Sequence, residues 1–232
     1  MRPSLEYKYG FPVVNCENIF EVLEELGIRP WPTIDGPMKL SQYVRRELTK
    51  KEIREVSRFA PDTEVEIFRD PEGEPFVGFR ATWRNGNGCL VFTLLPGDLI
   101  PVAAEFRHGA KIIGLIFPGG VKEDSDPSLA SCAKREFEAE TGIILQDVVP
   151  LDLGGTPLSA RGIELGSCSF LGILPKQIVV KRQNLDRKEF LKIVLVPLQE
   201  WMKLIEAGQV KEAASIVTTY LALRKLGRLS LV

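Results

Sequence analysis

Histidine is nearly absent from this chain of 232 residues, in which His108 is the only one. Most catalytic designs that depend on histidine, including Ser-His-Asp triads with a second histidine, are therefore excluded. There is also no excess of charge of either sign, because the formal net charge at pH 7 is −1. Domains that bind nucleic acids usually carry a basic patch, so we predict that nucleic acid is not a partner of this protein.

The sequence also lacks paired cysteines and long apolar runs. Its four cysteines are scattered and form no CxxC pair, so they give no zinc motif and are expected to be reduced thiols. They are Cys16, Cys89, Cys132 and Cys168. The N-terminus has no apolar core of the kind found in a signal peptide, and no apolar run is long enough to span a bilayer. We therefore expect a cytoplasmic protein with no membrane partner.

What the chain does contain is enough apolar sequence for a sizeable core, since 44% of its residues are hydrophobic. The pattern from about Asn18 to Phe59 is helical. One face of the first helix carries Ile19, Val22, Leu23 and Leu26, and Gly27 is placed to cap it. We predict an N-terminal helical appendage over residues 1–62 and a single domain over residues 63–232. Whether the appendage is a lid or a dimer element stays open.

The pattern changes to strands at Glu64. The expected strands before the middle of the chain are Glu64–Arg69, Phe76–Trp83, Cys89–Leu95, Leu99–Arg107 and Lys111–Phe117. The sequence Asp70-Pro71-Glu72-Gly73 predicts a turn after the first of these strands. The asparagine- and glycine-rich loop Arg84–Gly88 predicts a hairpin between the second and third strands.

The stretch from Phe117 to Ile143 carries the densest set of signals. Its Pro118–Gly120 turn cannot continue regular structure, and the glycines let the backbone approach a ligand closely. Asp126 is a suitable N-cap and the proline after it suits a first helical position. A helix is therefore predicted from this point to Thr141, with Gly142 as a left-handed C-cap.

Glu136 and Glu140 lie four residues apart on this helix and share one face, with Cβ atoms about 6 Å apart. Two carboxylates on a rigid face, opposite a glycine turn with backbone carbonyls, are the oxygen donors that Mg²⁺ or Mn²⁺ prefers. Glutamates at this spacing are also common on solvated helix faces, so the spacing alone leaves that alternative open.

The order of these parts resembles the Nudix box of the Nudix hydrolase superfamily. Seven residues fit the pattern of that box, namely Gly120, Arg135, Glu136, Phe137, Glu140, Gly142 and Ile143. Ala139 stands where the family has the first glutamate of a Glu-Glu pair, and one extra residue lies between Gly120 and Arg135. Asp126 or Glu123 is the candidate replacement for the early glutamate of the box.

The sequence around the box resembles the ADP-ribose pyrophosphatase branch of that superfamily. The similar segments are Pro101–Gly109, Phe117–Gly120, Phe190–Trp201, Ala207–Val210 and Glu212–Ser215, and the resemblance extends over roughly Glu64–Leu226. The resemblance implies an α/β/α sandwich, with a mixed, curved sheet between helices. It also implies a homodimer, whose interface we expect to use the strands from Glu64 to Leu95 or the helices before them.

The activity implied is metal-dependent hydrolysis of the diphosphate bridge in an ADP-ribose-like nucleoside diphosphate derivative, giving AMP and a sugar phosphate. Glu136, Glu140 and the Gly119 carbonyl would bind Mg²⁺ or Mn²⁺, and Gly120 and Arg107 would contact the substrate. Arg107 is equally suited to an ion pair with Glu105.

A further acidic residue of that branch comes from the loop before the late strand. Glu189 is the first candidate for it here and Asp186 the second. Arg135 is expected to pair with a carboxylate that needs orienting. Because Ala139 removes one box carboxylate, the alternative is a Nudix-fold nucleotide-binding or sensor protein with weakened or lost turnover.

Overall fold

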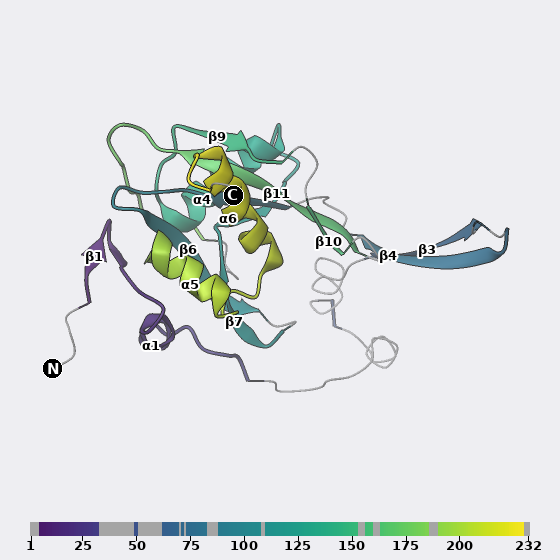
Figure 1. Cartoon of the computed structure of the whole chain (residues 1–232), viewed down its shortest axis with the longest axis horizontal. Coiled ribbons are helices and arrows are strands. Elements are labelled where there is room, and N and C mark those ends of the chain that lie inside the picture. Colours follow the sequence, from purple (N-terminus) through teal and green to yellow (C-terminus); the bar gives the residue numbers. More distant parts are fainter. Residues whose placement is uncertain are drawn as a thin grey trace.

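The computed structural model describes residues 5–32, 49–50, 62–69, 71, 73–82, 88–107, 110–152, 156–159, 163–185 and 190–229. Within these ranges the chain forms two main sheets between helices, with a long hairpin projecting from the body (Figure 1). None of the helices in these ranges is long and apolar enough to cross a membrane.

The larger sheet is mixed and is organised around β11 (Ile163–Ile173). Its strand order is β3-β4-β11-β5-β8, and β9 and β10 also pair with β11. The bounds are β3 (Asp62–Arg69), β4 (Pro75–Thr82), β5 (Gly88–Phe92), β8 (Gly119–Val121), β9 (Asp147–Pro150) and β10 (Thr156–Ser159). β4 and β5 run parallel to β11, whereas β9 and β10 run antiparallel to it.

The smaller sheet is antiparallel and has the order β12-β6-β7. These strands are β12 (Leu191–Pro197), β6 (Leu99–Arg107) and β7 (Ile112–Ile116). A short hairpin of β1 (Tyr7–Lys8) and β2 (Phe11–Pro12) precedes a parallel bridge between Val13 and Leu195. The beginning of the chain is therefore attached to the edge strand β12.

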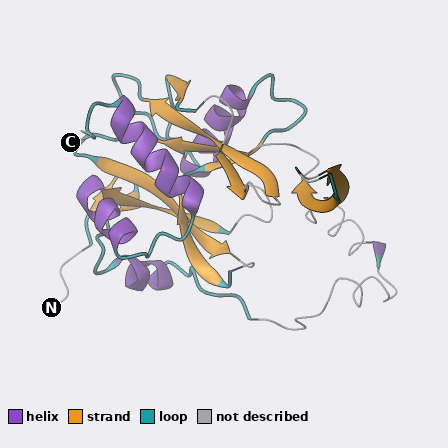
Figure 2. Ribbon diagram, turned by 45° about the vertical axis from the view of Figure 1, so that its right-hand side comes forward, coloured by secondary structure: helices purple, strands orange, loops and turns teal. Residues whose placement is uncertain are grey.

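Four helices cover the sheets within the described ranges (Figure 2). They are α1 (Ile19–Glu25), α4 (Leu129–Thr141), α5 (Leu198–Glu206) and α6 (Ala213–Lys225). Adjacent residues of β5 point to opposite faces of the sheet, because Phe92 packs in one core cluster and Val91 in another. The Phe92 cluster includes residues of α1, α5 and α6, whereas the Val91 cluster includes residues of α4. This is the predicted α/β/α sandwich.

Aromatic burial fixes α5 and α6 on their face of the sheets. Trp201 and Phe117 are both fully buried, with ring centroids 5.1 Å apart. The indole N–H of Trp201 donates to the Thr219 hydroxyl at 2.8 Å, so the polar end of this ring is satisfied. Burying a large side chain contributes about 1.5–3 kcal/mol. Trp201 is therefore a core residue.

The predicted N-terminal segment is described only in part. α1 and its buried face are confirmed, with Ile19, Val22 and Leu23 packed into the core cluster of Phe92. The helical pattern predicted as far as Phe59 lies outside the described residues at positions 33–48 and 51–59. The division at residues 62 and 63 stays a prediction.

The hairpin predicted between the second and third strands is wrong. β4 and β5 do not pair with each other, because both lie along the same edge of β11. β4 faces β11 at Ile163 and β5 faces it from Ser167 to Leu171. The sequence between them, residues 83–87, lies outside the described residues. An asparagine- and glycine-rich loop indicates a break in a strand, but strand pairing depends on residues far away in the sequence.

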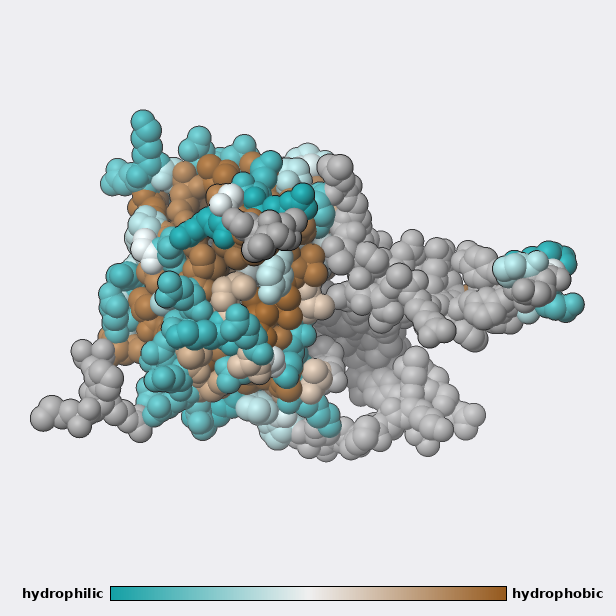
Figure 3. Space-filling view, in the orientation of Figure 1, coloured by the Kyte–Doolittle hydropathy of each residue, from teal (hydrophilic) through white to brown (hydrophobic). Residues whose placement is uncertain are grey.

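The hairpin that does form joins β3 and β4, with Arg69 opposite Pro75 in the register. The Arg69 guanidinium donates to the Gly73 carbonyl at 2.8 Å and closes the turn. Figure 1 shows this hairpin extending away from the body, and Figure 3 shows a hydrophilic tip. Val65 and Ile67 on β3 are 58% and 74% exposed. β3 is also the end strand of its sheet, so an edge strand with two exposed aliphatic side chains faces solvent in the single chain.

Candidate functional site

Gly119 and Gly120 were expected to interrupt regular structure, but they are the first two residues of strand β8. They lie against β5 with no space for larger residues, and we keep the name Gly119–Gly120 turn for them. β8 pairs antiparallel with β5, so that Gly119 faces Leu90 and Gly120 faces Cys89. A Cβ atom on Gly119 would collide with the backbone carbonyl of Cys89. A Cβ atom on Gly120 would lie 2.6 Å from the carboxyl carbon of Glu136. Glycine is therefore required here for close approach of the backbone.

The helix α4 that follows begins later than the sequence predicts. Its N-cap is Ser128, whose hydroxyl accepts the Ser131 N–H at 3.1 Å, and its first residue is Leu129. The prediction of Asp126 as N-cap is wrong, because the Asp126 carboxylate is bound to Arg135. The predicted C-cap is confirmed, since Gly142 has a φ of 70° and its N–H donates to the Glu138 carbonyl.

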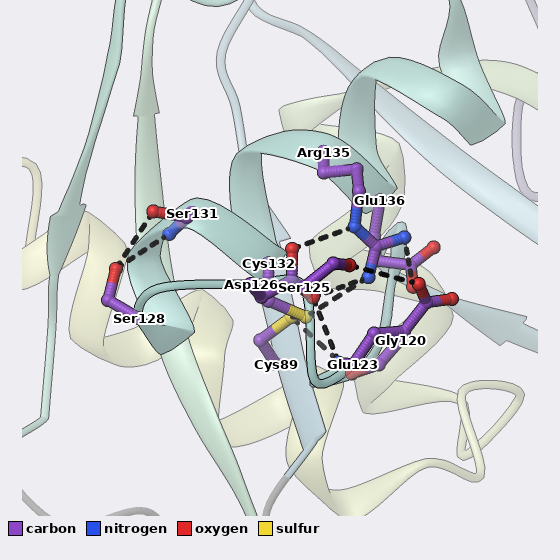
Figure 4. Close-up of polar contacts among 10 residues, drawn as sticks. All are labelled: Cys89, Gly120, Glu123, Ser125, Asp126, Ser128, Ser131, Cys132, Arg135 and Glu136. Atoms are coloured by element: carbon purple, nitrogen blue, oxygen red, sulfur yellow. Dashed lines mark hydrogen bonds and ion pairs between the residues drawn. The ribbon is translucent and has the colours of Figure 1, made fainter.

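Asp126 and Arg135 form a bidentate ion pair across the loop before α4 (Figure 4). The two N–O distances are 2.9 and 2.7 Å, and Asp126 is only 6% exposed. The pKa of Asp126 is lowered to about 2, chiefly by its hydrogen bonds to Arg135 and in smaller part by the Glu123 backbone N–H, which donates to the same carboxylate. Asp126 and Glu136 in turn raise the pKa of Arg135 above its usual range.

Arg135 also holds Glu136, through an ion pair of 2.9 Å between Nη1 and Oε1. The expectation that Arg135 orients a carboxylate is confirmed. Between the two acidic residues considered for the early box position, Asp126 is the one whose side chain binds Arg135. Glu123 contributes its backbone N–H instead.

Four of the five residues predicted for the metal and substrate site lie together around the turn, and the fifth, Arg107, lies on β6. Glu140 is 5% exposed, and its Oε2 accepts the Gly119 N–H at 3.0 Å. Glu136 comes from one turn earlier in α4 and lies beside Gly120. α4 thus presents both carboxylates to the Gly119–Gly120 turn. The assignment of Gly119, Glu136 and Glu140 to metal and of Gly120 to substrate stays a prediction.

This donor set fits a hard divalent cation. Mg²⁺ is usually bound through one or two carboxylates, with waters and substrate phosphates at its remaining positions. The missing Cβ of Gly120 leaves the space that the Glu136 carboxylate occupies. Over the described ranges, no three side chains of histidine, cysteine, aspartate or glutamate converge on a point where they could hold an ion. The protein therefore offers part of a coordination shell.

Arg107 lies on β6 between two carboxylates. Its guanidinium contacts Glu105 at 2.7 Å and Glu212 at 3.1 Å. Its Cγ would be 2.7 Å from a Cβ on Gly114, so this side chain crosses the neighbouring strand where a glycine gives room. The ion pair with Glu105 was one of the two roles expected for Arg107. The second role, substrate binding, stays a prediction, and Glu212 was missed because no local pattern connects it to β6.

The chain that leads to the late acidic loop runs along the C-terminal end of α4. The Lys181 N–H donates to the Gly142 carbonyl at 2.7 Å, and the Asn184 N–H donates to the Ala139 carbonyl at 2.8 Å. The Gln183 amide donates to the Glu140 carbonyl. Sequence reasoning did not single out these backbone contacts. Glu189 and Asp186, the predicted catalytic residues of this loop, lie outside the described residues.

Comparison with known proteins places the fold. No protein-family model matches the sequence, and no curated protein matches it. The crystal structure of an ADP compounds hydrolase superposes on this chain with a TM-score of 0.62. The two chains are 20% identical, and the match covers 74% of this chain and 90% of the hydrolase. This chain shares the mixed α/β/α fold of that hydrolase. At this level of identity the likeness shows the fold alone.

Proposed function

We propose that this protein hydrolyses the diphosphate bridge of a nucleoside diphosphate derivative such as ADP-ribose, in a reaction that depends on Mg²⁺ or Mn²⁺. The products would be AMP and a sugar phosphate. The observation that carries this proposal is the arrangement of Glu136 and Glu140 on α4 against the Gly119–Gly120 turn. The shared fold with an ADP compounds hydrolase supports the choice of substrate class.

In this proposal the protein supplies a rigid frame of oxygen donors. Glu136, Glu140 and the Gly119 carbonyl would hold the ion, and a divalent ion there would supply charge neutralisation for the diphosphate and polarisation of water. Arg135 fixes the Glu136 carboxylate, and Asp126 fixes Arg135. The Gly119 N–H fixes Glu140 in the same way. These contacts orient the carboxylates before substrate binds.

Residues farther along the site have proposed roles in binding and proton transfer. Gly120 allows the substrate close to the backbone, and Arg107 contacts a phosphate after exchanging one of its carboxylate partners. Glu189, or else Asp186, positions or deprotonates the attacking water. We also propose that the active form is a homodimer.

A second candidate is a protein that binds the nucleotide without turning it over. Ala139 favours it, because this position lacks the carboxylate that completes the box. Only two carboxylates, Glu136 and Glu140, are described at the turn. With fewer negative ligands, divalent-ion affinity falls.

A hydrolysis assay decides between the two candidates. Purified protein is incubated with a panel of nucleoside diphosphate derivatives and Mg²⁺ or Mn²⁺, and AMP is separated and measured. The enzyme proposal expects AMP from the wild type but none above background from Glu136→Gln or Glu140→Gln. Glu138→Gln is the matched control, because glutamine keeps the acceptor that Glu138 offers the Leu145 N–H at 2.9 Å.

The same variants test the metal site without reference to activity. An ion that binds the folded state raises the melting temperature, so Mn²⁺ should stabilise the wild type and Glu138→Gln. Glu136→Gln and Glu140→Gln should lose this response and stay folded. If both variants keep the full response, Glu136 and Glu140 are not the ligands.

A further inference from the structure

Two buried thiols meet directly beneath the proposed metal site. Cys89 on β5 and Cys132 on α4 are 43 residues apart in sequence, yet their sulfur atoms are 3.4 Å apart. Cys89 is 1% exposed and Cys132 is fully buried. Both are thiols rather than disulfides in this structure. The pair has no part in the proposed hydrolysis.

Each thiol also contacts a group that shapes the site (Figure 4). The Cys89 sulfur lies 3.4 Å from the Gly120 carbonyl oxygen. The Cys132 sulfur lies 3.9 Å from Nη2 of Arg135, the residue that holds Glu136. Cys132 is also one helical turn before Glu136 on α4. The pair therefore touches both the turn and the frame of the carboxylates.

The two sulfur atoms lie close enough together to react with each other. A disulfide has an S–S distance of about 2.05 Å, so the two sulfur atoms would need to approach by about 1.4 Å from 3.4 Å. Side-chain rotation together with a small shift of β5 against α4 can supply such a movement. Buried cysteines also occur as simple apolar packing, in which case the contact has no chemical role.

We propose that Cys89 and Cys132 are a redox-active pair, whose disulfide links β5 to α4 and weakens divalent-ion binding at Glu136 and Glu140. The second half of this statement rests on the proposed function. The oxidant is a small diffusible peroxide, which reaches the pair when the mostly exposed loop after β8, residues 122–125, opens locally.

The chemistry balances with hydrogen peroxide as the oxidant. One thiolate attacks a peroxide oxygen, an S–O bond forms, the O–O bond breaks and hydroxide leaves, taking up a proton to become water. The second thiolate then attacks the sulfenic sulfur, so that the S–S bond forms and the S–O bond breaks with loss of a second water. Two thiols are oxidised by two electrons, and one peroxide is reduced to two waters. A dithiol such as dithiothreitol reverses the process.

The disulfide would disturb the metal site through the contacts of the two thiols with Gly120 and Arg135. Drawing Cys89 towards Cys132 removes the thiol proton that faces the Gly120 carbonyl, and the Glu136 carboxylate already fills the space beside the Cα of Gly120. Cys132 at the same time leaves its contact with Arg135. Loss of outer partners of metal ligands lowers metal affinity by about 10- to 100-fold, and we expect the lower end of this range.

Cys168 provides a matched control. It lies on β11 directly opposite Cys89 in the parallel register and belongs to the same buried cluster. It is therefore both a rival partner for Cys89 and a cysteine whose removal should leave the proposed disulfide intact. Cys16, on the far side of the sheets with α1, is a second control.

The experiment treats the full-length protein with stepwise hydrogen peroxide and follows intact mass, peptide maps and Mn²⁺ affinity. We expect the loss of two hydrogen atoms, a cross-linked peptide joining Cys89 to Cys132, and about ten-fold weaker Mn²⁺ binding, all reversed by dithiothreitol. Cys168→Ala and Cys16→Ala should behave like the wild type. Cys132→Ala should form no disulfide and keep its Mn²⁺ affinity in peroxide.

Other outcomes overturn the proposal. They are a gain of oxygen without cross-linking, a link between Cys89 and Cys168, or a Cys89–Cys132 link with unchanged Mn²⁺ affinity. The peptide map of the wild type carries the test even if Cys132→Ala does not fold. A reduced wild type that binds no Mn²⁺ would refute the proposed function, and would thereby remove the metal half of this proposal, whereas the peptide map would still decide the disulfide.

Discussion

The Gly119–Gly120 turn and the β3–β4 hairpin both depend on glycine, but for different physical reasons. In the hairpin, Gly73 has a φ of 94°, and a Cβ atom there would meet nothing within 4 Å. At Gly119 and Gly120 the backbone needs no such φ, and a Cβ atom would strike Cys89 or Glu136. One glycine is needed for its conformation, whereas the other two are needed for the space they leave.

This difference extends to the surroundings of each region. The turn is enclosed by groups that are already bonded, namely the buried Asp126 and Glu140 and the half-buried Arg135. The hairpin stands away from the body and exposes Val65 and Ile67 on its end strand. We infer that the turn is organised within one chain, whereas the hairpin has a surface that a second chain could cover.

The largest effect should come from filling the space at Gly119. In Gly119→Ala the new methyl group meets a backbone carbonyl that cannot rotate away, so the free energy of unfolding should fall by about 3 kcal/mol. In Gly73→Ala the cost is only the unfavourable φ, about 1–2 kcal/mol. Urea titrations of both variants measure the difference. Equal losses would show that the turn is no tighter than the hairpin.

Gly120→Ala separates stability from metal binding at the same turn. Its Cβ would meet the carboxyl end of Glu136 rather than backbone, so the side chain can move aside for about 1 kcal/mol. The moved carboxylate should no longer serve the ion, and stabilisation by Mn²⁺ should disappear. Thermal melts with and without Mn²⁺ measure this, and a full Mn²⁺ response would place the ion elsewhere.

Lowering the pH should destabilise the region around the Gly119–Gly120 turn, because Asp126 becomes protonated. Because Arg135 lowers the pKa of Asp126 in the folded state from 3.8 to about 2, the ion pair contributes stability at pH values above 4. That contribution is lost as the pH falls from about 4 to 2. Asp126→Asn should therefore be less stable than the wild type at pH 7, with a smaller loss of stability over this window.

The comparison of melting temperatures at pH 7 and pH 3 checks this prediction. Glu200 titrates in the same window, since hydrogen bonds led by that from Cys16 lower its pKa to about 2, so some acid dependence should remain in Asp126→Asn. If Asp126→Asn and the wild type lose stability in parallel, the ion pair contributes nothing measurable.

The sequence predicted the parts of the site whose signals are local. Gly142 as a cap and the shared face of Glu136 and Glu140 follow from helix periodicity. The predicted N-cap of α4 was wrong because Ser128 and Asp126 are both good caps. Arg135 binds Asp126, which leaves Ser128 as the cap. Local sequence contains no information on a choice of that kind.

The sequence also did not predict contacts between residues that are far apart in the chain. The hairpin predicted at Arg84–Gly88 failed because β11, far along the chain, lies beside both β4 and β5. Glu212 beside Arg107 and Cys132 beside Cys89 are likewise contacts between distant segments. One sequence gives the residues of such pairs without showing that they meet.

A substitution in the β3–β4 hairpin should change the assembly of the protein without changing Mn²⁺ binding at the turn. If β3 contributes to a homodimer, the exposed Ile67 side chain is covered in the dimer. Ile67→Lys then places a charge in the interface, and the dimer should dissociate. Sedimentation at micromolar concentration measures the change from dimer to monomer. The stabilisation by Mn²⁺ should stay as in the wild type, since the turn is organised within one chain.

Val179→Lys is the control for this variant, because Val179 is another exposed aliphatic residue, at 46%, outside the hairpin. It should leave the assembly unchanged. A wild type that sediments only as a monomer would remove the dimer proposal, and equal effects of both lysines would assign the interface to neither residue.

The smallest change in folding stability is expected at Ala139, where the site lacks a carboxylate. Ala139 lies on α4 between Glu136 and Glu140 in sequence, three residues after the first and one before the second. Ala139→Glu adds a carboxylate beside the two proposed ligands. Alanine and glutamate are both good helix formers, so the helix should lose less than about 0.5 kcal/mol. The Asn184 contact should persist, because it uses the backbone carbonyl of residue 139.

If the protein is a hydrolase limited by its metal site, Ala139→Glu should bind Mn²⁺ about ten-fold more tightly, a gain of ~1.4 kcal/mol, and release AMP faster from ADP-ribose. If the site has been rebuilt for binding alone, the added carboxylate tightens the ion without any gain in AMP, because the missing step is not metal binding. Measuring Mn²⁺ affinity and AMP release on the same preparation separates these cases. A variant with tighter Mn²⁺ and unchanged AMP release would contradict the weakened-enzyme account, while leaving the turn as the place where the ion binds.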